Sequence, residues 1–130
     1  MPSEQTCTVL YIDDSSINTI LVERILTSRP DVVFGSASDG ITGLDQAMLL
    51  HPDLVLLDLT LPDISGEQVL TRLRADPVTH AVPVIVVSGD TDPAVQHRVL
   101  ALGAQWFLTK PYEVADLLRL VDTSLTAGRR

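Results

Sequence analysis

Two adjacent aspartates, Asp13 and Asp14, follow an apolar run that suits a buried strand. Two carboxylates about 4 Å apart repel each other by roughly 4 kcal/mol at an effective dielectric constant near 20. A hard divalent cation relieves such repulsion, and Mg²⁺ commonly binds one or two carboxylates while keeping several waters. Alternatively, Asp14 or Ser15 caps the following helix by accepting hydrogen bonds from its free backbone N–H groups. This stretch alone is compatible with both interpretations.

Further polar side chains stand at the ends of apolar runs later in the chain. Asp58 follows "LVLL", Ser88 follows "VIVV", and Lys110 with Pro111 follows "WFLT". Taken singly, each has an ordinary explanation as a helix cap, a turn residue or a solvated lysine. The carboxyl ends of parallel strands meet at one edge of a sheet, where ligands bind in α/β folds. Together with the aspartate pair, these side chains predict a functional cleft.

The elements that would position these side chains are apolar runs separated by amphipathic stretches. Most of the runs are continuously apolar, as in strands that are covered on both faces. We predict strands at residues 8–12, 32–37, 54–57, 84–87 and 106–109. Alternation of strands and helices predicts a doubly wound α/β fold with a five-stranded parallel sheet, because each parallel connection is a crossover that contains a helix.

The stretches between the strands carry helix start signals. Asp39, Ser65 and Asp92 are expected N-caps. Gln68 lies three residues after Ser65, which is the spacing of a capping box, and Pro93 suits a first helical position.

Apolar spacing predicts which helix faces enter the core. The first helix, which ends before Pro30, is expected to bury Ile17, Leu21, Ile25 and Leu26. The second, which ends at His51, is expected to bury Ile41, Leu44, Ala47 and Met48. A last helix is expected from about Glu113.

Composition and charge limit the classes of function. The net charge of −8 over 130 residues disfavours direct nucleic-acid binding, which normally requires a basic surface. No apolar run approaches the ~20 residues of a membrane span, so we expect no membrane insertion, and the N-terminus lacks a signal pattern. The single Cys7 cannot form an internal disulfide. We expect one soluble, cytoplasmic domain over residues 1–130, with a core from about 8 to 125.

Phosphoryl chemistry follows from the set of side chains at the strand ends. Mg²⁺ held by Asp13, Asp14 and Asp58 would neutralise the acidic cleft and bind a phosphoryl oxygen. Asp58, at the centre of the predicted sheet, could then attack a phosphoryl group and form an acyl phosphate. Lys110 and the Ser88 hydroxyl could bind the remaining oxygens.

The order and spacing of these motifs resemble the response-regulator receiver domain, the phosphoacceptor module of two-component signalling. The resemblance runs from about residue 8 to 125, through "YIDD", "LVLLDLTLPDISG", "VIVVSGD" and "WFLTKP". It implies a flavodoxin-like, three-layer fold with strand order 2-1-3-4-5 and five helices. It also implies phosphorylation by a histidine kinase or histidine phosphotransfer protein, and signalling to a downstream protein partner or through a homodimer. The only catalysis it implies is of the domain's own phosphorylation and dephosphorylation.

The resemblance assigns roles in the acidic cleft. Asp58 would be the phosphoacceptor. Asp14 and Asp58 would ligate Mg²⁺ directly, together with the backbone carbonyl of Thr60, and Asp13 would act mainly through a metal-bound water.

It also assigns a switch. Lys110 would pair with the phosphoryl group, and Pro111 would follow a cis peptide bond. Ser88, where Thr is commoner, would move toward the phosphoryl group, and Phe107, which has no phenol hydroxyl, would turn inward behind it. Trp106 departs from the small or polar residue usual at its position; it either marks a partner surface or packs against the last helix.

Other interpretations fit parts of the pattern. A haloacid-dehalogenase-like, Mg-dependent phosphatase would place a second aspartate two residues after the nucleophile, where this chain has Thr60. A flavodoxin-like cofactor carrier would need a glycine- and hydroxyl-rich phosphate loop after the first strand, where Asp13 and Asp14 would repel a phosphate. A receiver that only docks, without being phosphorylated, would not need the intact set of site residues.

Overall fold

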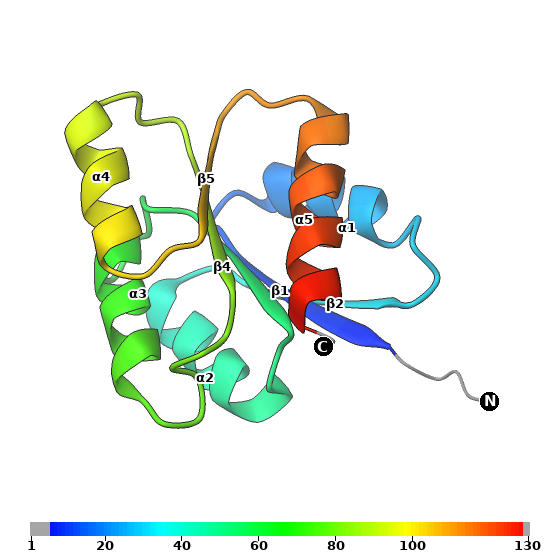
Figure 1. Cartoon of the computed structure of the whole chain (residues 1–130), viewed down its shortest axis with the longest axis horizontal. Helices are drawn as coiled ribbons and strands as arrows, with labels where there is room; N and C mark the ends of the chain where they lie inside the picture. Colours follow the sequence, from blue (N-terminus) through cyan, green and yellow to red (C-terminus); the bar gives the residue numbers. More distant parts are fainter. Residues whose placement is uncertain (1–5, 129–130) are drawn as a thin grey trace.

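The computed structural model describes residues 6–128 of the chain, in which strands and helices alternate (Figure 1). The strands are β1 (Cys7–Ile12), β2 (Val32–Ala37), β3 (Leu54–Leu57), β4 (Val84–Ser88) and β5 (Trp106–Thr109). The helices are α1 (Ser16–Leu26), α2 (Gly40–Leu50), α3 (Gly66–Ala75), α4 (Pro93–Ala101) and α5 (Val114–Gly128). All strand pairs are parallel, in the order β2-β1-β3-β4-β5. The predicted doubly wound fold and strand order are confirmed.

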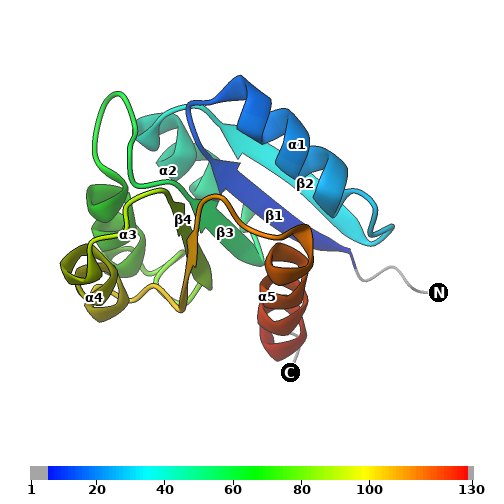
Figure 2. The ribbon, with the colours of Figure 1, turned by 90° about the horizontal axis from the view of Figure 1, so that it is seen from above.

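The helices cover both faces of the sheet (Figure 2). Helices α1 and α5 pack on one face, and α2, α3 and α4 pack on the other. The sheet therefore separates two apolar clusters, and every residue of the central strand β3 is buried between them. This double cover explains why the central strands are continuously apolar in the sequence.

The predicted helix caps are present. Asp39 accepts a hydrogen bond from the Thr42 N–H at the start of α2. Ser65 and Gln68 form a reciprocal capping box at the start of α3. Asp92 caps α4, and Pro93 occupies its first turn, so these local signals fix where the helices begin.

The predicted core face of α1 is wrong in part. Leu26 is buried and Ile25 is half-buried, but Ile17 is 77% exposed and Leu21 is 49% exposed. Val22, four residues before Leu26, supplies the other buried contact, so the core side of the helix is rotated away from Ile17.

The predicted core face of α2 is also partly wrong. Ala47 is buried, whereas Ile41 and Met48 are exposed. The face of α2 against the sheet includes Gly43, where an added Cβ would lie 2.6 Å from a side-chain carbon of Ile12. The close approach of helix and strand requires a very small residue there and leaves Ile41 and Met48 outside. No helix in residues 6–128 is both long and apolar enough to cross a membrane.

Candidate functional site

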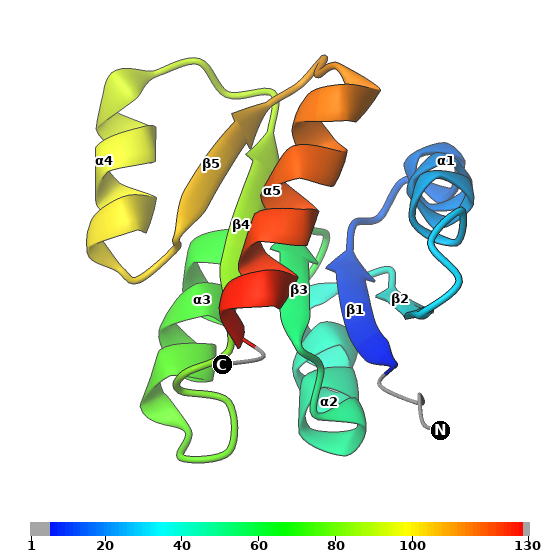
Figure 3. The ribbon, with the colours of Figure 1, turned by 45° about the vertical axis from the view of Figure 1, so that its right-hand side comes forward.

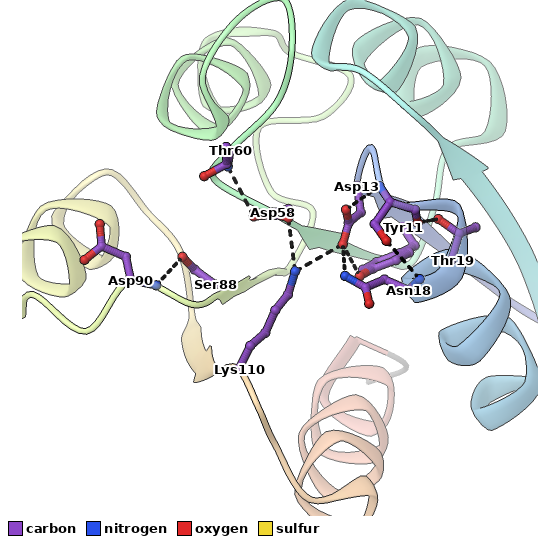
Figure 4. A network of polar contacts seen from close by, with 10 residues as sticks. Tyr11, Asp13, Asn18, Thr19, Asp58, Thr60, Ser88, Asp90 and Lys110 are labelled. Carbon is purple, nitrogen blue, oxygen red and sulfur yellow. Dashed lines mark hydrogen bonds and ion pairs between the residues drawn. The ribbon is translucent and has the colours of Figure 1, made fainter.

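The carboxyl ends of the strands lie at one edge of the sheet (Figure 3), and the predicted site residues converge there (Figure 4). Asp13 follows β1, Asp58 follows β3, Ser88 ends β4, and Lys110 follows β5. Sheet-like hydrogen bonds extend to these positions: the Asp58 N–H donates to the Ile12 carbonyl at 2.9 Å, and the Lys110 N–H donates to the Ser88 carbonyl at 2.9 Å. The backbone of the sheet therefore fixes the spacing of the site.

The carboxylates form one cluster. Asp13, Asp14 and Asp58 each offer an oxygen atom, and these atoms lie within 4.8 Å of one another. Asp13 and Asp58 are buried, whereas Asp14 is exposed. Ser15, not Asp14, caps α1, because its hydroxyl accepts a hydrogen bond from the Asn18 N–H at 3.2 Å. Asp14 is therefore available as an oxygen ligand, and an all-carboxylate cluster suits a hard cation.

Lys110 connects the two buried carboxylates. Its Nζ lies 3.2 Å from Asp13 Oδ2 and 3.1 Å from Asp58 Oδ2. Burial alone would lower the pKa of Lys110, but the hydrogen bond with Asp58 and the charges of Asp58 and Asp13 raise it above its ordinary value. The Lys110 side chain therefore stays protonated as an ammonium ion. Lys110 is the only lysine in the sequence, and its peptide bond to Pro111 is cis.

Asp13 is held by several donors. Its Oδ1 accepts the Ser15 N–H at 2.9 Å, and its Oδ2 accepts the Tyr11 hydroxyl at 2.5 Å and the Asn18 amide at 3.3 Å, besides Lys110. Burial raises the pKa of Asp13, but the bonds from Tyr11 and Ser15 and the charge of Lys110 outweigh burial and lower it. Asp13 is therefore held as an anion.

Asp58 has weaker support. Its Oδ1 accepts the Thr60 N–H at 3.2 Å, and its Oδ2 accepts Lys110. Burial and the nearby charge of Asp13 raise the pKa of Asp58 above its ordinary value, against the opposing effects of Thr60 and Lys110. A buried carboxylate whose negative charge is poorly compensated is typical of a reactive position.

The loop after Asp58 requires a glycine at its end. An added Cβ at Gly66 would lie 2.5 Å from the Asp58 carbonyl oxygen and 2.6 Å from Leu59 Cα. Asp63, in the same loop, accepts hydrogen bonds from the Gly40 and Ile41 N–H groups at the start of α2, each at 2.8 Å. The loop that carries Thr60 is thus fixed both to the end of β3 and to α2.

The side chains of the predicted switch lie on the other side of the site. The Ser88 hydroxyl accepts a hydrogen bond from the Asp90 N–H at 3.1 Å and is turned toward Asp90 in Figure 4. Phe107 is half-buried and packs against the core on the α3 and α4 face. Trp106 is 41% exposed. In this structure, therefore, the Ser88 hydroxyl is engaged with the loop that leads to α4.

Sequence reasoning missed Tyr11 and Asn18. Residues two apart on a strand point to the same face, so the position of Tyr11 two residues before Asp13 was a usable signal. Asn18 gives a weaker signal, since its amide reaches Asp13 only because Ser15 starts a helix at that point.

The fold and the acidic cleft together define a phosphoacceptor class of signalling domain, and comparison with known proteins agrees. Residues 9–122 match the family model described as the response regulator receiver domain. The chain therefore belongs to the response regulator receiver family, as its motifs indicated. These findings favour a receiver over the phosphatase and cofactor-carrier interpretations.

Two curated relatives that the chain matches are longer than it is. The chain is 35% identical over 120 residues to the nitrate/nitrite response regulator protein NarL of Escherichia coli, covering 92% of this chain and 55% of NarL. It is 38% identical over 125 residues to protein-glutamate methylesterase/protein-glutamine glutaminase 1 of Myxococcus xanthus, covering 92% of this chain and 35% of that protein. The chain thus spans about half, or less, of these relatives.

Solved structures share the fold. The response regulator domain of Thermotoga maritima CheB matches with a TM-score of 0.84 and 28% identity, covering 93% of this chain and 97% of that one. The receiver domain of the sensor histidine kinase PA1611 from Pseudomonas aeruginosa, which was solved with a magnesium ion coordinated in its active site cleft, matches with a TM-score of 0.85. At 24% identity, covering 93% of this chain and 98% of that one, the second match speaks for the fold alone.

Proposed function

We propose that this receiver accepts a phosphoryl group on Asp58 from the phosphohistidine of a histidine kinase or histidine phosphotransfer protein. The observation that carries the proposal is Asp58 itself: a buried carboxylate of raised pKa at the centre of the edge, 3.1 Å from a fixed ammonium ion. An Asp58 oxygen attacks phosphorus, the bond from phosphorus to the histidine nitrogen breaks, and the imidazole leaves with that electron pair. The product is an acyl phosphate on Asp58.

The acidic cluster fits a magnesium ion. Asp13, Asp14 and Asp58, with the backbone carbonyl of Thr60, would hold it, because they offer only the oxygen ligands that Mg²⁺ prefers. When bound, the ion neutralises carboxylate and phosphoryl charge.

Lys110 and Ser88 bind the transferred group in this proposal. The Lys110 ammonium, already beside Asp58, leaves Asp13 and pairs with a phosphoryl oxygen, which places a fixed positive charge where negative charge develops. Ser88 turns its hydroxyl from the Asp90 N–H toward the phosphoryl group, and Phe107 moves inward behind it. Catalysis is limited to the domain's own phosphorylation and dephosphorylation, and the output is a changed surface that a downstream protein or a second copy reads.

The donor protein would dock beside α1. Ile17, Leu21 and Val114 are exposed apolar residues. Leu21 and Val114 line a groove of about 380 Å³ that Lys110 also lines. Because the transferred phosphoryl group must reach Asp58 next to Lys110, a protein that carries it on histidine would cover this face. In this proposal, the apolar residues of α1 that lie outside the core contact the donor protein.

Phosphotransfer from a panel of autophosphorylated histidine kinases of the source organism tests the proposal. We expect one kinase to label the chain strongly, and Asp58→Asn to abolish the label. Ile17→Glu should slow transfer from that kinase by about 10-fold, the effect of losing about 1.4 kcal/mol of docking energy. Leu49→Glu, on the equally exposed surface of α2, is the matched control.

Acetyl phosphate separates docking from chemistry. It should label wild type and Ile17→Glu equally, because it needs no docked protein. Slower labelling of Ile17→Glu by both donors would contradict the docking face. Turnover of an external phosphate ester would instead support a phosphatase.

A further inference from the structure

We infer that Tyr11 is a positioning residue for phosphoryl transfer: its phenol holds Asp13, so that Lys110 can leave that carboxylate for the phosphoryl group. The inference rests on the proposed function and deepens it. It assigns a role to the last polar side chain of β1, which lies beneath the acidic cluster.

Tyr11 is placed to touch Asp13 and little else that is polar. Its side chain is 1% exposed and packs in the cluster formed with α1 and α5. The hydroxyl donates to Asp13 Oδ2 at 2.5 Å (Figure 4). Because an ionised carboxylate can only accept hydrogen bonds, the phenol is the donor in this contact. Asp13 is the one hydrogen-bond partner of this hydroxyl within residues 6–128, so the phenol is placed to orient that carboxylate.

Asp13 Oδ2 receives several donors at once. The hydrogen bonds from Tyr11, Asn18 and Lys110 all end on this oxygen, while the Ser15 N–H donates to Oδ1. An ionised carboxylate has about four acceptor sites, two on each oxygen. Three donors exceed the two acceptor sites of Oδ2. One of them can therefore leave while the buried anion keeps hydrogen-bond partners.

Lys110 is the donor that is able to leave. Tyr11 belongs to β1 and Asn18 to α1, elements next to Asp13 in the chain, whereas Lys110 reaches in on a long side chain from the end of β5. Lys110 already contacts Asp58, so pairing with a phosphoryl group on Asp58 requires it to give up only Asp13. The neutral donors remain on Asp13 after that step.

Removal of the phenol hydroxyl should make Lys110 harder to release. In Tyr11→Phe, Asp13 has one hydrogen-bond donor fewer and depends more on Lys110. Removing a charged partner from a buried anion costs free energy, so the release of Lys110 becomes less favourable. The ring and its packing stay. The variant should therefore lose affinity for a ligand that requires Lys110 to move, and should keep its affinity for a metal ion alone.

Affinity for beryllofluoride, a phosphoryl analogue, at saturating Mg²⁺ tests the inference. We expect Tyr11→Phe to bind beryllofluoride about 10-fold more weakly, the scale of one hydrogen bond to a charged group. Mg²⁺ affinity measured without beryllofluoride should stay within about twofold, because Lys110, Asn18 and Ser15 still hold Asp13. This split between two ligands of one site is not expected from general destabilisation.

The single lysine gives a direct signal. Labelling with ¹⁵N-lysine marks one side-chain ammonium group in the chain, that of Lys110. On titration with beryllofluoride, the NMR chemical shift of this ammonium group should reach the same final value in wild type and in Tyr11→Phe. The variant should need about 10-fold more beryllofluoride to reach it.

Tyr112→Phe is the matched control. Tyr112 lies in the same groove as Lys110, but its hydroxyl makes no hydrogen bond to another residue within 6–128. We expect wild-type affinity for both ligands. If Tyr11→Phe fails to fold, Asn18→Ala removes the other neutral side-chain donor to Asp13 and should shift beryllofluoride binding in the same direction.

The inference is wrong if Tyr11→Phe binds beryllofluoride as wild type does, if Tyr112→Phe loses as much, or if Mg²⁺ and beryllofluoride affinities fall together. The proposed function fails differently: wild type itself would then bind no beryllofluoride and take no phosphoryl group on Asp58.

Discussion

Two sides of the site are built differently. On the β1 side, Asp13 is fixed by Tyr11, Ser15 and Asn18, all from β1 and the start of α1. On the β4 side, the Ser88 hydroxyl has a hydrogen bond only to the loop after β4, as far as residues 6–128 show. The β1 side therefore holds charge in place before any phosphoryl group arrives, whereas the β4 side has a contact that is easily exchanged.

The β4 side leads to a weakly anchored helix. The Ser88 hydroxyl accepts the Asp90 N–H, the Asp90 carboxylate accepts the Asp92 N–H, and the Asp92 carboxylate accepts the Ala94 N–H in the first turn of α4. Val99 is the one residue of α4 that is fully buried. Rotation of Ser88 would thus break the first link of a short chain that ends at a helix with little hold on the core.

Lys110→Ala should have the largest effect, because Lys110 joins the two sides. We expect beryllofluoride affinity to fall by about 100-fold, the upper range for a hydrogen bond between charged groups. Mg²⁺ affinity should stay the same or rise slightly, since a competing cation leaves the cleft. Calorimetric titration of each ligand measures both. Loss of metal binding would show that Lys110 is needed to hold the carboxylates in place for the metal, and does not merely form ion pairs with them.

Asp92→Ala should loosen the start of α4. Loss of a helix N-cap costs about 1 kcal/mol, so amide exchange at Ala94 and Val95 should speed up about fivefold. The same region should exchange faster in wild type with beryllofluoride, when Ser88 has turned away. Asp76→Ala is the matched control, because its carboxylate accepts the Val78 N–H at 2.8 Å in the turn that follows α3. Unchanged exchange in α4 on beryllofluoride binding would break the comparison.

Trp106 reports on the β4 side. It is the only tryptophan, and it is part exposed beside Phe107. Its emission should change on beryllofluoride with Mg²⁺, change less with metal alone, and change much less in Ser88→Ala. Flat emission while beryllofluoride binding is shown independently would mean that output does not run through this face.

The smallest effect is expected at Asp63, which fixes the loop after Asp58 to α2. Hydrogen bonds from the Ile41 and Gly40 N–H groups lower the pKa of Asp63 to about 2, below the value of about 3.9 expected in the unfolded chain. Its stabilising contribution is therefore full above about pH 4 and is lost as pH falls through about 2. Asp63→Asn should flatten the dependence of unfolding free energy on pH in this window. An unchanged slope would show that the loop is held by other contacts.

The sequence predicted the fold well where local signals agree. Continuous apolar strands, caps such as Asp39 and Asp92, and polar residues at each strand end all favoured one topology, and the structure has it. Convergence at the sheet edge followed from parallel topology alone.

Tertiary packing decided what the sequence did not show. The exposure of Ile17 depends on how α1 rotates against the sheet, and that of Ile41 on the close contact made by Gly43. Tyr11 was counted as another apolar strand residue, because a hydrophobic pattern does not show which polar group its hydroxyl contacts. Ser88 was identified as part of the site, but its bond to the Asp90 N–H depends on a side-chain rotamer that spacing does not encode.

The most direct test of the account is the site of phosphorylation. Wild-type protein treated with acetyl phosphate and Mg²⁺ should gain the mass of one phosphoryl group, stable to acid and labile to alkali, and peptide mapping should place it on Asp58. Asp58→Asn should gain none, whereas Asp45→Asn, on the exposed surface of α2, should gain it as wild type does. Undiminished labelling of Asp58→Asn would contradict the central claim.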